Sequence, residues 1–149
     1  MAGWRVSMVV GDKSYLNAVL SVRSNIDSGM FRPVQLAAIQ ALKNSRIWHN
    51  QLNEIYNRRR SLVYQLLDYL GLSYEKGLPG LFVWAKAPDY VGDVEDFLDN
   101  LLYEKGIFLA PGKTFGKNGI RYARASICVP DKIIRKAIEK IKLHQEVQQ

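Results

Sequence analysis

The feature that most constrains the fold is a long run of helical periodicity near the middle of the chain. Its apolar residues recur three, four or seven positions apart and form one stripe over about six turns of helix: Trp48, Leu52, Ile55, Leu62, Leu66 and Leu70. Gly71 follows at a position where helices commonly end. In a chain of 149 residues, we expect a helix over residues 46–71 to connect two packed bodies or to form part of a subunit interface.

The segment before this helix predicts one strand and two helices. Trp4–Val10 is short, apolar and rich in β-branched residues, so we expect a strand there. Helical spacing follows over residues 13–24, turn-forming residues fill positions 25–31, and Pro33 marks the start of a second helix. The predicted strand has no neighbour in sequence before residue 81. This isolation indicates the edge of a sheet whose other strands lie elsewhere.

The part of the chain after the long helix predicts a small sheet backed by helices. Strand patterns cover residues 81–88 and 120–128, and a shorter one over residues 107–112 runs into a Pro-Gly turn. Residues 93–106 predict a helix, with an aspartate N-cap, acidic residues in the first turn and a glycine at the end. A final helix begins near Pro130. This order is typical of an α+β unit.

Composition narrows the possible partners. The formal net charge of +7 favours anionic ligands such as phosphates, carboxylates or nucleic acid. The one basic run, Arg58–Arg60, lies inside the long helical pattern, where a solvated face or a subunit contact is the simpler interpretation, and no nucleic-acid-binding motif accompanies it. A single cysteine, Cys128, excludes an intrachain disulfide, and with two histidines it does not make an ordinary zinc site. No apolar stretch approaches the ~20 residues of a membrane span. We expect a cytoplasmic protein with no metal, nucleic-acid or membrane partner.

Two arginines stand in otherwise apolar strand patterns. Arg5 follows Trp4, and a charge there needs either a solvent-exposed face or a partner. In residues 120–128, alternation places Tyr122 and Arg124 on one polar face of the strand. Each arginine has two interpretations at this point: an ordinary solvent-facing residue, or a guanidinium fork aimed at a phosphate or carboxylate.

A glycine-rich loop precedes the last strand. Its sequence, PGKTFGKNG over residues 111–119, matches neither a Walker phosphate loop nor a dinucleotide fingerprint, and a turn before a strand is the simpler interpretation. His49 and His144 lie in helical patterns without a matching nucleophile or carboxylate, so nothing supports a catalytic triad. Cys128 is interpreted as a small residue at the end of a strand.

In their order and spacing, these segments resemble the class I/II aminotransferases, which depend on pyridoxal phosphate and have fold type I. The start, AGWR, is similar to a family segment in which a Ser-Lys pair comes just before Gly-Trp-Arg. The family's lysine forms the Schiff base with the cofactor, and its arginine binds the cofactor phosphate. Arg5 matches that arginine. The matching lysine would fall before Met1, so the resemblance implies no catalytic residue in this chain, and Lys13 lies in the wrong place to replace it.

Two further segments carry the resemblance. SNIDSGMFRPVQLAAIQAL is similar to the family segment that reaches the neighbouring subunit's active site, which implies a homodimer with Ser28 near the partner's cofactor. APGKTFGKNGIRYARASIC is similar to the segment that ends in the arginine gripping the substrate α-carboxylate. Arg124 matches that arginine, and Tyr122 beside it is a second substrate-site candidate. Arg121 is the main competitor, and alternation places it on the opposite face.

The resemblance runs from Met1 to about Leu143 and is closest to the branch with the aspartate, alanine and diaminopimelate aminotransferases. It implies an α/β fold cut short: the end of the large cofactor domain over residues 1–45, a connecting helix over 46–71, and a complete small α+β domain over 72–149. Ser7 departs from the family, which usually has glycine there. The groups that contact the cofactor ring belong to the family's N-terminal half and are absent here.

The implied function is the C-terminal part of an enzyme that moves an amino group between an amino acid and a 2-oxo acid. The chain alone would be inactive, because the Schiff-base lysine is expected upstream of residue 1. Two alternatives stay open: a non-catalytic small-domain interaction module, and a pyridoxal-phosphate-dependent lyase or decarboxylase on the same scaffold.

Overall fold

The computed structural model describes residues 2–147. The chain divides into two compact units between Asn50 and Gln51, and each unit is described by itself. Residues 1, 148 and 149, at the outer ends of the first and last predicted domains, lie outside the described part. Among the described helices, none combines the length and the hydropathy needed to cross a bilayer.

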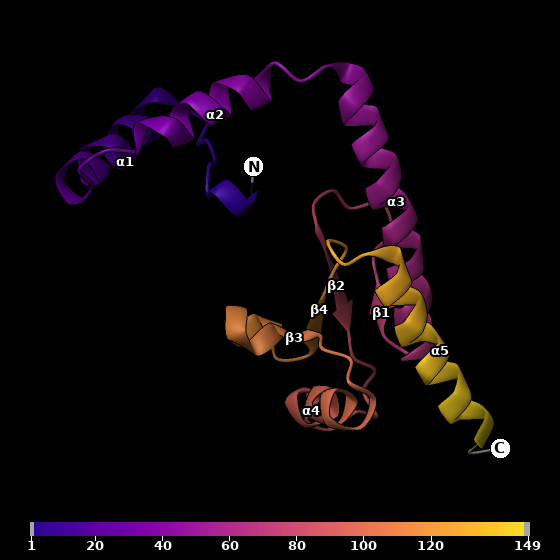
Figure 1. The fold of residues 1–149 in the computed structure, drawn as a ribbon. Helices are drawn as coiled ribbons and strands as arrows, with labels where there is room; N and C mark the ends of the chain where they lie inside the picture. Colours follow the sequence, from indigo (N-terminus) through magenta and orange to yellow (C-terminus); the bar gives the residue numbers. More distant parts are fainter. Residues whose placement is uncertain (1, 148–149) are drawn as a thin grey trace. The chain divides into compact units, whose positions relative to one another are not determined.

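The N-terminal unit is helical. It contains a short 3-10 helix, two α-helices and the first residues of a third: η1 (Ala2–Trp4), α1 (Lys13–Ile26), α2 (Arg32–Leu42) and α3 (Arg46–Tyr69) (Figure 1). Asp12 caps α1, since its carboxylate accepts a hydrogen bond from the Ser14 backbone N–H at 2.8 Å. Pro33 lies in the first turn of α2. Both helices predicted for this segment are therefore confirmed.

The strand predicted over Trp4–Val10 is wrong for this chain. Ala2–Trp4 forms a 3-10 helix, Arg5 has a left-handed backbone (φ 57°), and residues 6–10 have no regular secondary structure. A strand needs a neighbour to satisfy its backbone N–H and C=O groups. The strands among the described residues all lie between positions 73 and 126 and pair with one another. The segment Trp4–Val10 is rich in β-branched residues, but no described strand pairs with it.

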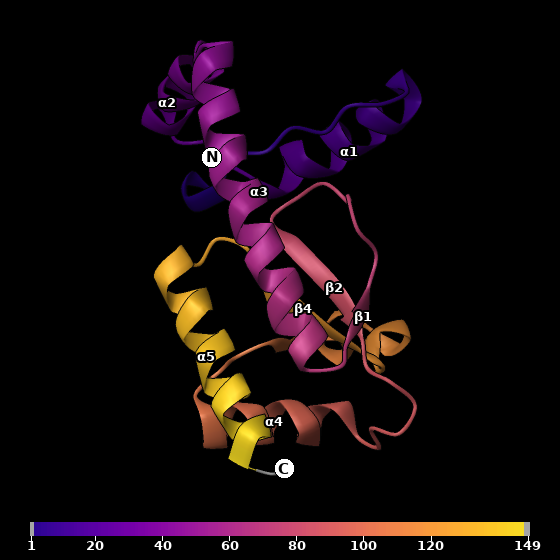
Figure 2. The ribbon, with the colours of Figure 1, turned by 90° about the vertical axis from the view of Figure 1, so that its right-hand side faces the viewer.

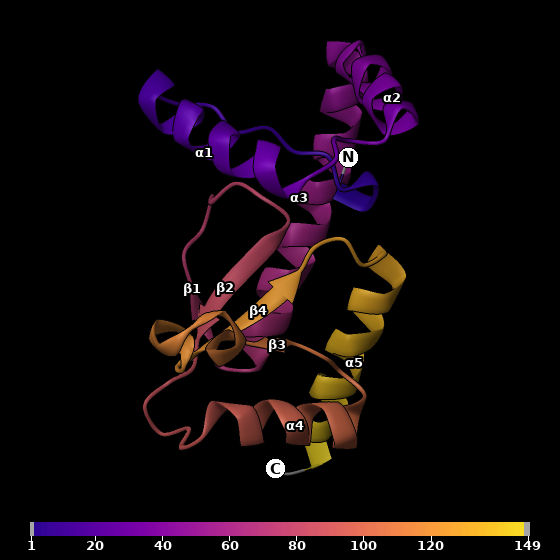
Figure 3. The same ribbon diagram turned by 90° about the vertical axis from the view of Figure 1, so that its left-hand side faces the viewer.

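The C-terminal unit contains a four-stranded antiparallel sheet in the order β1-β2-β4-β3. Its strands and remaining helices are β1 (Ser73–Tyr74), β2 (Phe82–Lys86), α4 (Val94–Lys105), β3 (Ala110–Pro111), β4 (Tyr122–Ser126) and α5 (Asp131–Val147). Figure 2 shows α3 and α5 in front of the sheet, and Figure 3 shows them behind it. These two helices cover one face of the sheet. The predicted small sheet backed by helices is confirmed, whereas the sequence predicts α3 only as a connecting helix.

The core lies between that face and the helices. Its wholly buried side chains include Leu67 from α3 and Ile127 just after β4. The sheet contributes Val83, Ala85, Ala123 and Ala125, which form one buried cluster with apolar residues of the helices. Burial alternates along both central strands, so the intervening residues face away from the core.

Local signals set the helix ends. Asp93 caps α4 by accepting hydrogen bonds from the backbone N–H groups of Glu95 (2.7 Å) and Asp96 (3.3 Å). Gly106 ends that helix in a left-handed conformation, φ 65°. Gly71, at φ 70°, follows the end of α3 in the same way. These boundaries confirm the sequence-based predictions for the helix ends.

Candidate functional site

The site centres on Arg124, on the face of β4 that points away from the core. Its guanidinium carbon lies 4.2 Å from the ring centroid of Phe82 and 4.2 Å from that of Phe115. Phe82 comes from β2, and Phe115 comes from η2 (Gly112–Phe115), a 3-10 helix in the glycine-rich loop. Throughout residues 2–147, the Arg124 guanidinium makes no hydrogen bond and no ion pair. Its N–H donors are therefore uncommitted, although its position is defined by two aromatic rings.

Arg121 has the opposite environment. Its Nη1 donates to the backbone carbonyls of Val91 and Gly92, at 2.7 Å each, and its Nη2 donates to that of Pro88 at 2.6 Å. These carbonyls belong to the segment between β2 and α4. Arg121 therefore holds that segment in place, and both of its terminal nitrogens already donate to backbone carbonyls. The two arginines that the sequence left in competition are clearly distinguished by geometry.

Aromatic side chains extend the surface beside Arg124. Trp84 lies directly opposite Arg124 in the register between β2 and β4. The Trp84 ring packs edge to face against the rings of Phe115 and Tyr122. The distances between ring centroids are 5.4 Å to Phe115 and 6.2 Å to Tyr122. Trp84, Phe115 and Tyr122, with Asn118 and Gly119, line a hollow of about 360 Å³, here called the aromatic hollow. Tyr122 and Arg124, both named from the sequence, thus lie together on one face of the sheet.

The glycine-rich loop folds tightly onto this face. A Cβ added at Gly119 would lie 2.1 Å from the Gly112 carbonyl oxygen, and one at Gly112 would lie 2.4 Å from the Gly119 carbonyl oxygen. Only glycine allows two backbones to approach this closely. The Lys113 ammonium pairs with Glu95 of α4, and this hydrogen bond raises the pKa of Lys113. The loop, orange in Figure 3, lies on the sheet face opposite α3 and α5. It is more than the simple turn that the sequence suggested.

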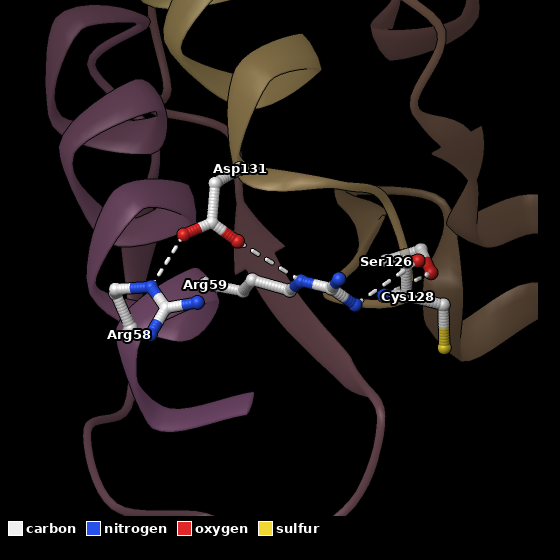
Figure 4. Close-up of polar contacts among 5 residues, drawn as sticks. All are labelled: Arg58, Arg59, Ser126, Cys128 and Asp131. Carbon is white, nitrogen blue, oxygen red and sulfur yellow. Dashed lines mark hydrogen bonds and ion pairs between the residues drawn. The ribbon is translucent and has the colours of Figure 1, made fainter. Parts of the chain in front are cut away.

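An ion-pair network fixes the far end of β4 (Figure 4). The Asp131 carboxylate accepts hydrogen bonds from Arg58 and, at 3.1 Å, from the Nε of Arg59. Arg59 also donates to the Cys128 carbonyl at 3.4 Å, and the Cys128 N–H donates to the Ser126 hydroxyl at 3.2 Å. The hydrogen bond from Arg58, supported by Arg59, lowers the pKa of Asp131. The segment leaving β4 is thereby tied to α3.

Sequence reasoning missed the role of the Arg58–Arg60 run. It suggested a solvated face or a subunit contact, whereas these side chains bind partners within the C-terminal unit. Besides the pair at Asp131, Arg60 donates to the Leu78 carbonyl and, at 2.7 Å, to the Gly80 carbonyl. No local signal could reveal these contacts, because Asp131 lies 73 residues after Arg58 in the sequence.

Arg5 and Ser28 belong to the N-terminal unit and are both exposed. Arg5 lies between η1 and the irregular segment 6–10, and no hydrogen bond or ion pair engages its guanidinium within the described residues. Ser28 lies in the connection between α1 and α2. The structure thus brings Tyr122 and Arg124 together in one unit and places these two residues in the other.

The chain resembles known proteins over nearly all of its length. The family model for aminotransferase class I and II matches residues 1–141. An LL-diaminopimelate aminotransferase of Oleidesulfovibrio alaskensis is 36% identical over 95% of this chain. The chain spans only 36% of the length of that relative.

Solved structures also match the chain over nearly all of its length. Substrate-bound BacF of Bacillus subtilis matches with a TM-score of 0.78 and 31% identity, covering 96% of this chain and 37% of that one. An aminotransferase of Staphylococcus aureus matches with a TM-score of 0.77 and 33% identity. The match covers 95% of this chain and 37% of the Staphylococcus aureus chain. These similarities extend through both units of the chain.

Proposed function

Since the chain belongs to the class I and II aminotransferases, we propose that it is the C-terminal part of an enzyme that moves an amino group between an amino acid and a 2-oxo acid. Enzymes of this family use pyridoxal phosphate. The proposal concerns the larger protein, because this chain spans 36% of the LL-diaminopimelate aminotransferase it resembles.

One observation carries the proposal: Arg124 presents a guanidinium with free donors on an open sheet face. A planar guanidinium binds a carboxylate through two parallel hydrogen bonds. Arg121 is less suited to this role, because its Nη1 and Nη2 already donate to three backbone carbonyls. We assign Arg124 to the α-carboxylate of the substrate, which would orient the reacting carbon. Tyr122, on the same face, is assigned to the edge of the substrate site.

Arg5 is proposed as a ligand of the cofactor phosphate. Its exposed, unengaged guanidinium has the charge and the donors that a phosphate needs, so it fits that end of pyridoxal phosphate. When bound, the cofactor supplies an electron sink for the charge left on the substrate carbon after proton loss. We propose that the lysine that holds the cofactor and moves this proton lies upstream of residue 1. The 149-residue chain alone would then not transaminate.

We further propose that the enzyme is a homodimer in which Ser28 lies near the partner's cofactor. Its support is the surface of the N-terminal unit, where no described side chain is buried. Large apolar residues of α1 and α2 are exposed there, including Tyr15, Leu20, Ile26, Leu36, Ile39 and Leu42. Such a surface needs covering, and a second subunit would cover part of it. The exposed free thiol of Cys128 suits a reducing compartment, so we place the enzyme in the cytoplasm.

Complementation tests the function. The chain is mixed with the N-terminal part of the Oleidesulfovibrio alaskensis enzyme that it does not span, and that enzyme's own C-terminal part is the positive control. With pyridoxal phosphate, amino transfer to 2-oxo acids is measured for a panel of amino acids. We expect transfer from the mixed complex and none from either part alone. A complex that binds the cofactor but transfers no amino group from any donor would contradict the proposal.

A further inference from the structure

Two phenylalanines from distant segments converge on Arg124. Phe82 and Phe115 are 33 positions apart, are 42% and 50% exposed, and lie at equal distances from the guanidinium carbon. Neither side chain belongs to the buried core. Burial therefore does not account for their position. The contact that the two rings share is the Arg124 guanidinium.

The backbone directs each ring toward Arg124. In the antiparallel register, Phe82 pairs with Ser126 and Trp84 with Arg124, so Phe82 is a diagonal neighbour of Arg124 on the same face. Phe115 ends the 3-10 helix η2. The contact between Gly112 and Gly119 folds this loop back on itself, and the ion pair from Lys113 to α4 anchors it.

The chemistry of these contacts differs from that around Arg121. A cation over an aromatic ring is held by its attraction to the ring quadrupole. This contact uses none of the guanidinium N–H groups, so they stay available for hydrogen bonds. A carboxylate or carbonyl partner would hold Arg124 more tightly but would consume the donors that a substrate needs, as the carbonyls do at Arg121. Aromatic contacts restrict the side chain while keeping its donors available.

We propose that Phe82 and Phe115 are positioning residues that hold the Arg124 guanidinium oriented for a carboxylate before the carboxylate binds. The inference rests on the proposed function of Arg124. A guanidinium that is already restricted loses less conformational entropy on binding, which strengthens binding without a new contact. The glycine-rich loop is then part of the substrate site, because it carries Phe115.

Nuclear magnetic resonance on the 149-residue chain tests this role. Ring currents should shift the side-chain resonances of Arg124 upfield. The variants are Phe82→Leu, Phe115→Leu and Phe115→Tyr. Phe108→Leu is the matched control, since Phe108 is 68% exposed and is not among the described rings that hold the Arg124 guanidinium. Each protein is titrated with pyruvate, the simplest 2-oxo acid, while Arg124 is observed. Thermal unfolding of each variant reports its folding.

We expect each leucine variant at positions 82 and 115 to lose part of the upfield shift and to bind pyruvate roughly two- to fivefold more weakly. Phe115→Tyr should restore both properties, and the control should match the wild type. A purely structural role would lower the unfolding temperature of the leucine variants without changing pyruvate affinity, which would overturn the inference.

The outcomes separate the two proposals. If both leucine variants stay folded and bind pyruvate like the wild type, the positioning role is wrong and Arg124 keeps its proposed function. If the wild type shows the upfield shift but pyruvate never perturbs Arg124, the carboxylate role of Arg124 fails, and the positioning role fails with it.

Discussion

Arg121 and Arg124 lie three positions apart in the sequence, yet both terminal nitrogens of the Arg121 guanidinium donate hydrogen bonds, whereas the Arg124 guanidinium donates none within the described residues. Arg121 donates to three carbonyls of the segment before α4, whereas the Arg124 guanidinium lies against the rings of Phe82 and Phe115. The first arrangement stabilises the fold, and the second suits a ligand.

Substitution should separate these roles. Arg121→Ala removes charge-assisted hydrogen bonds to three carbonyls, and we expect it to lower the free energy of unfolding by about 1–3 kcal/mol. Arg124→Ala removes contacts with partly exposed rings, and we expect a loss of about 1 kcal/mol or less. Urea denaturation of both variants measures the difference. Equal losses would contradict the division of roles.

The ion pairs of Asp131 should make stability depend on pH. Arg58 and Arg59 lower the pKa of this carboxyl in the folded chain, so its contribution is present above the unfolded pKa and is lost as pH falls through the folded pKa. Asp131→Asn should therefore destabilise the chain at pH 7, and the difference from wild type should shrink in acid. Asp99→Asn, at an exposed position, is the control for removing a charge. A difference that stays constant down to pH 2 would exclude this linkage.

The close approach of Gly112 and Gly119 predicts a sharp steric effect. Gly119→Ala would place a methyl group 2.1 Å from a backbone oxygen that cannot easily move, so we expect a loss of about 1–3 kcal/mol and a displaced Phe115. Gly92→Ala has open space around its Cβ and should change stability by about 0.5 kcal/mol or less. Calorimetry measures the unfolding temperatures of the two variants. Similar unfolding temperatures for both variants would mean that the loop adopts another conformation.

Cofactor trapping tests where the covalent lysine lies. The chain is incubated with pyridoxal phosphate, reduced with borohydride and analysed by mass spectrometry. We expect no single lysine to be labelled stoichiometrically, because the proposed lysine precedes residue 1. A stoichiometric label at one position of this chain would show that a different lysine holds the cofactor.

The sequence was informative wherever the signal was local. Asp93 and Gly106 mark the ends of α4 through contacts within the helix itself, and alternation correctly assigned Arg124 to the outer face of β4. The strand predicted over Trp4–Val10 failed because strand formation depends on a partner, which no local pattern reveals. The two-residue strand β1 is too short to give a periodic signal.

The surroundings of the site were not predictable for the same reason. Nothing near Phe82 or Phe115 in the sequence indicates that both meet Arg124, because strand register and loop closure bring them there. The Arg58–Asp131 pair likewise joins residues that are 73 positions apart. Local chemistry thus identified the candidate arginine, and tertiary structure supplied the groups that hold it.

The most direct test of the central claim compares the two arginines in one experiment. The wild-type chain is titrated with pyruvate while the Nη–H resonances of Arg121 and Arg124 are followed by nuclear magnetic resonance. We expect a saturable change at Arg124 and none at Arg121, whose two terminal nitrogens already donate to backbone carbonyls. A saturable change at Arg121, or no change at Arg124 up to high concentration, would contradict the assignment of Arg124 as the carboxylate-binding residue.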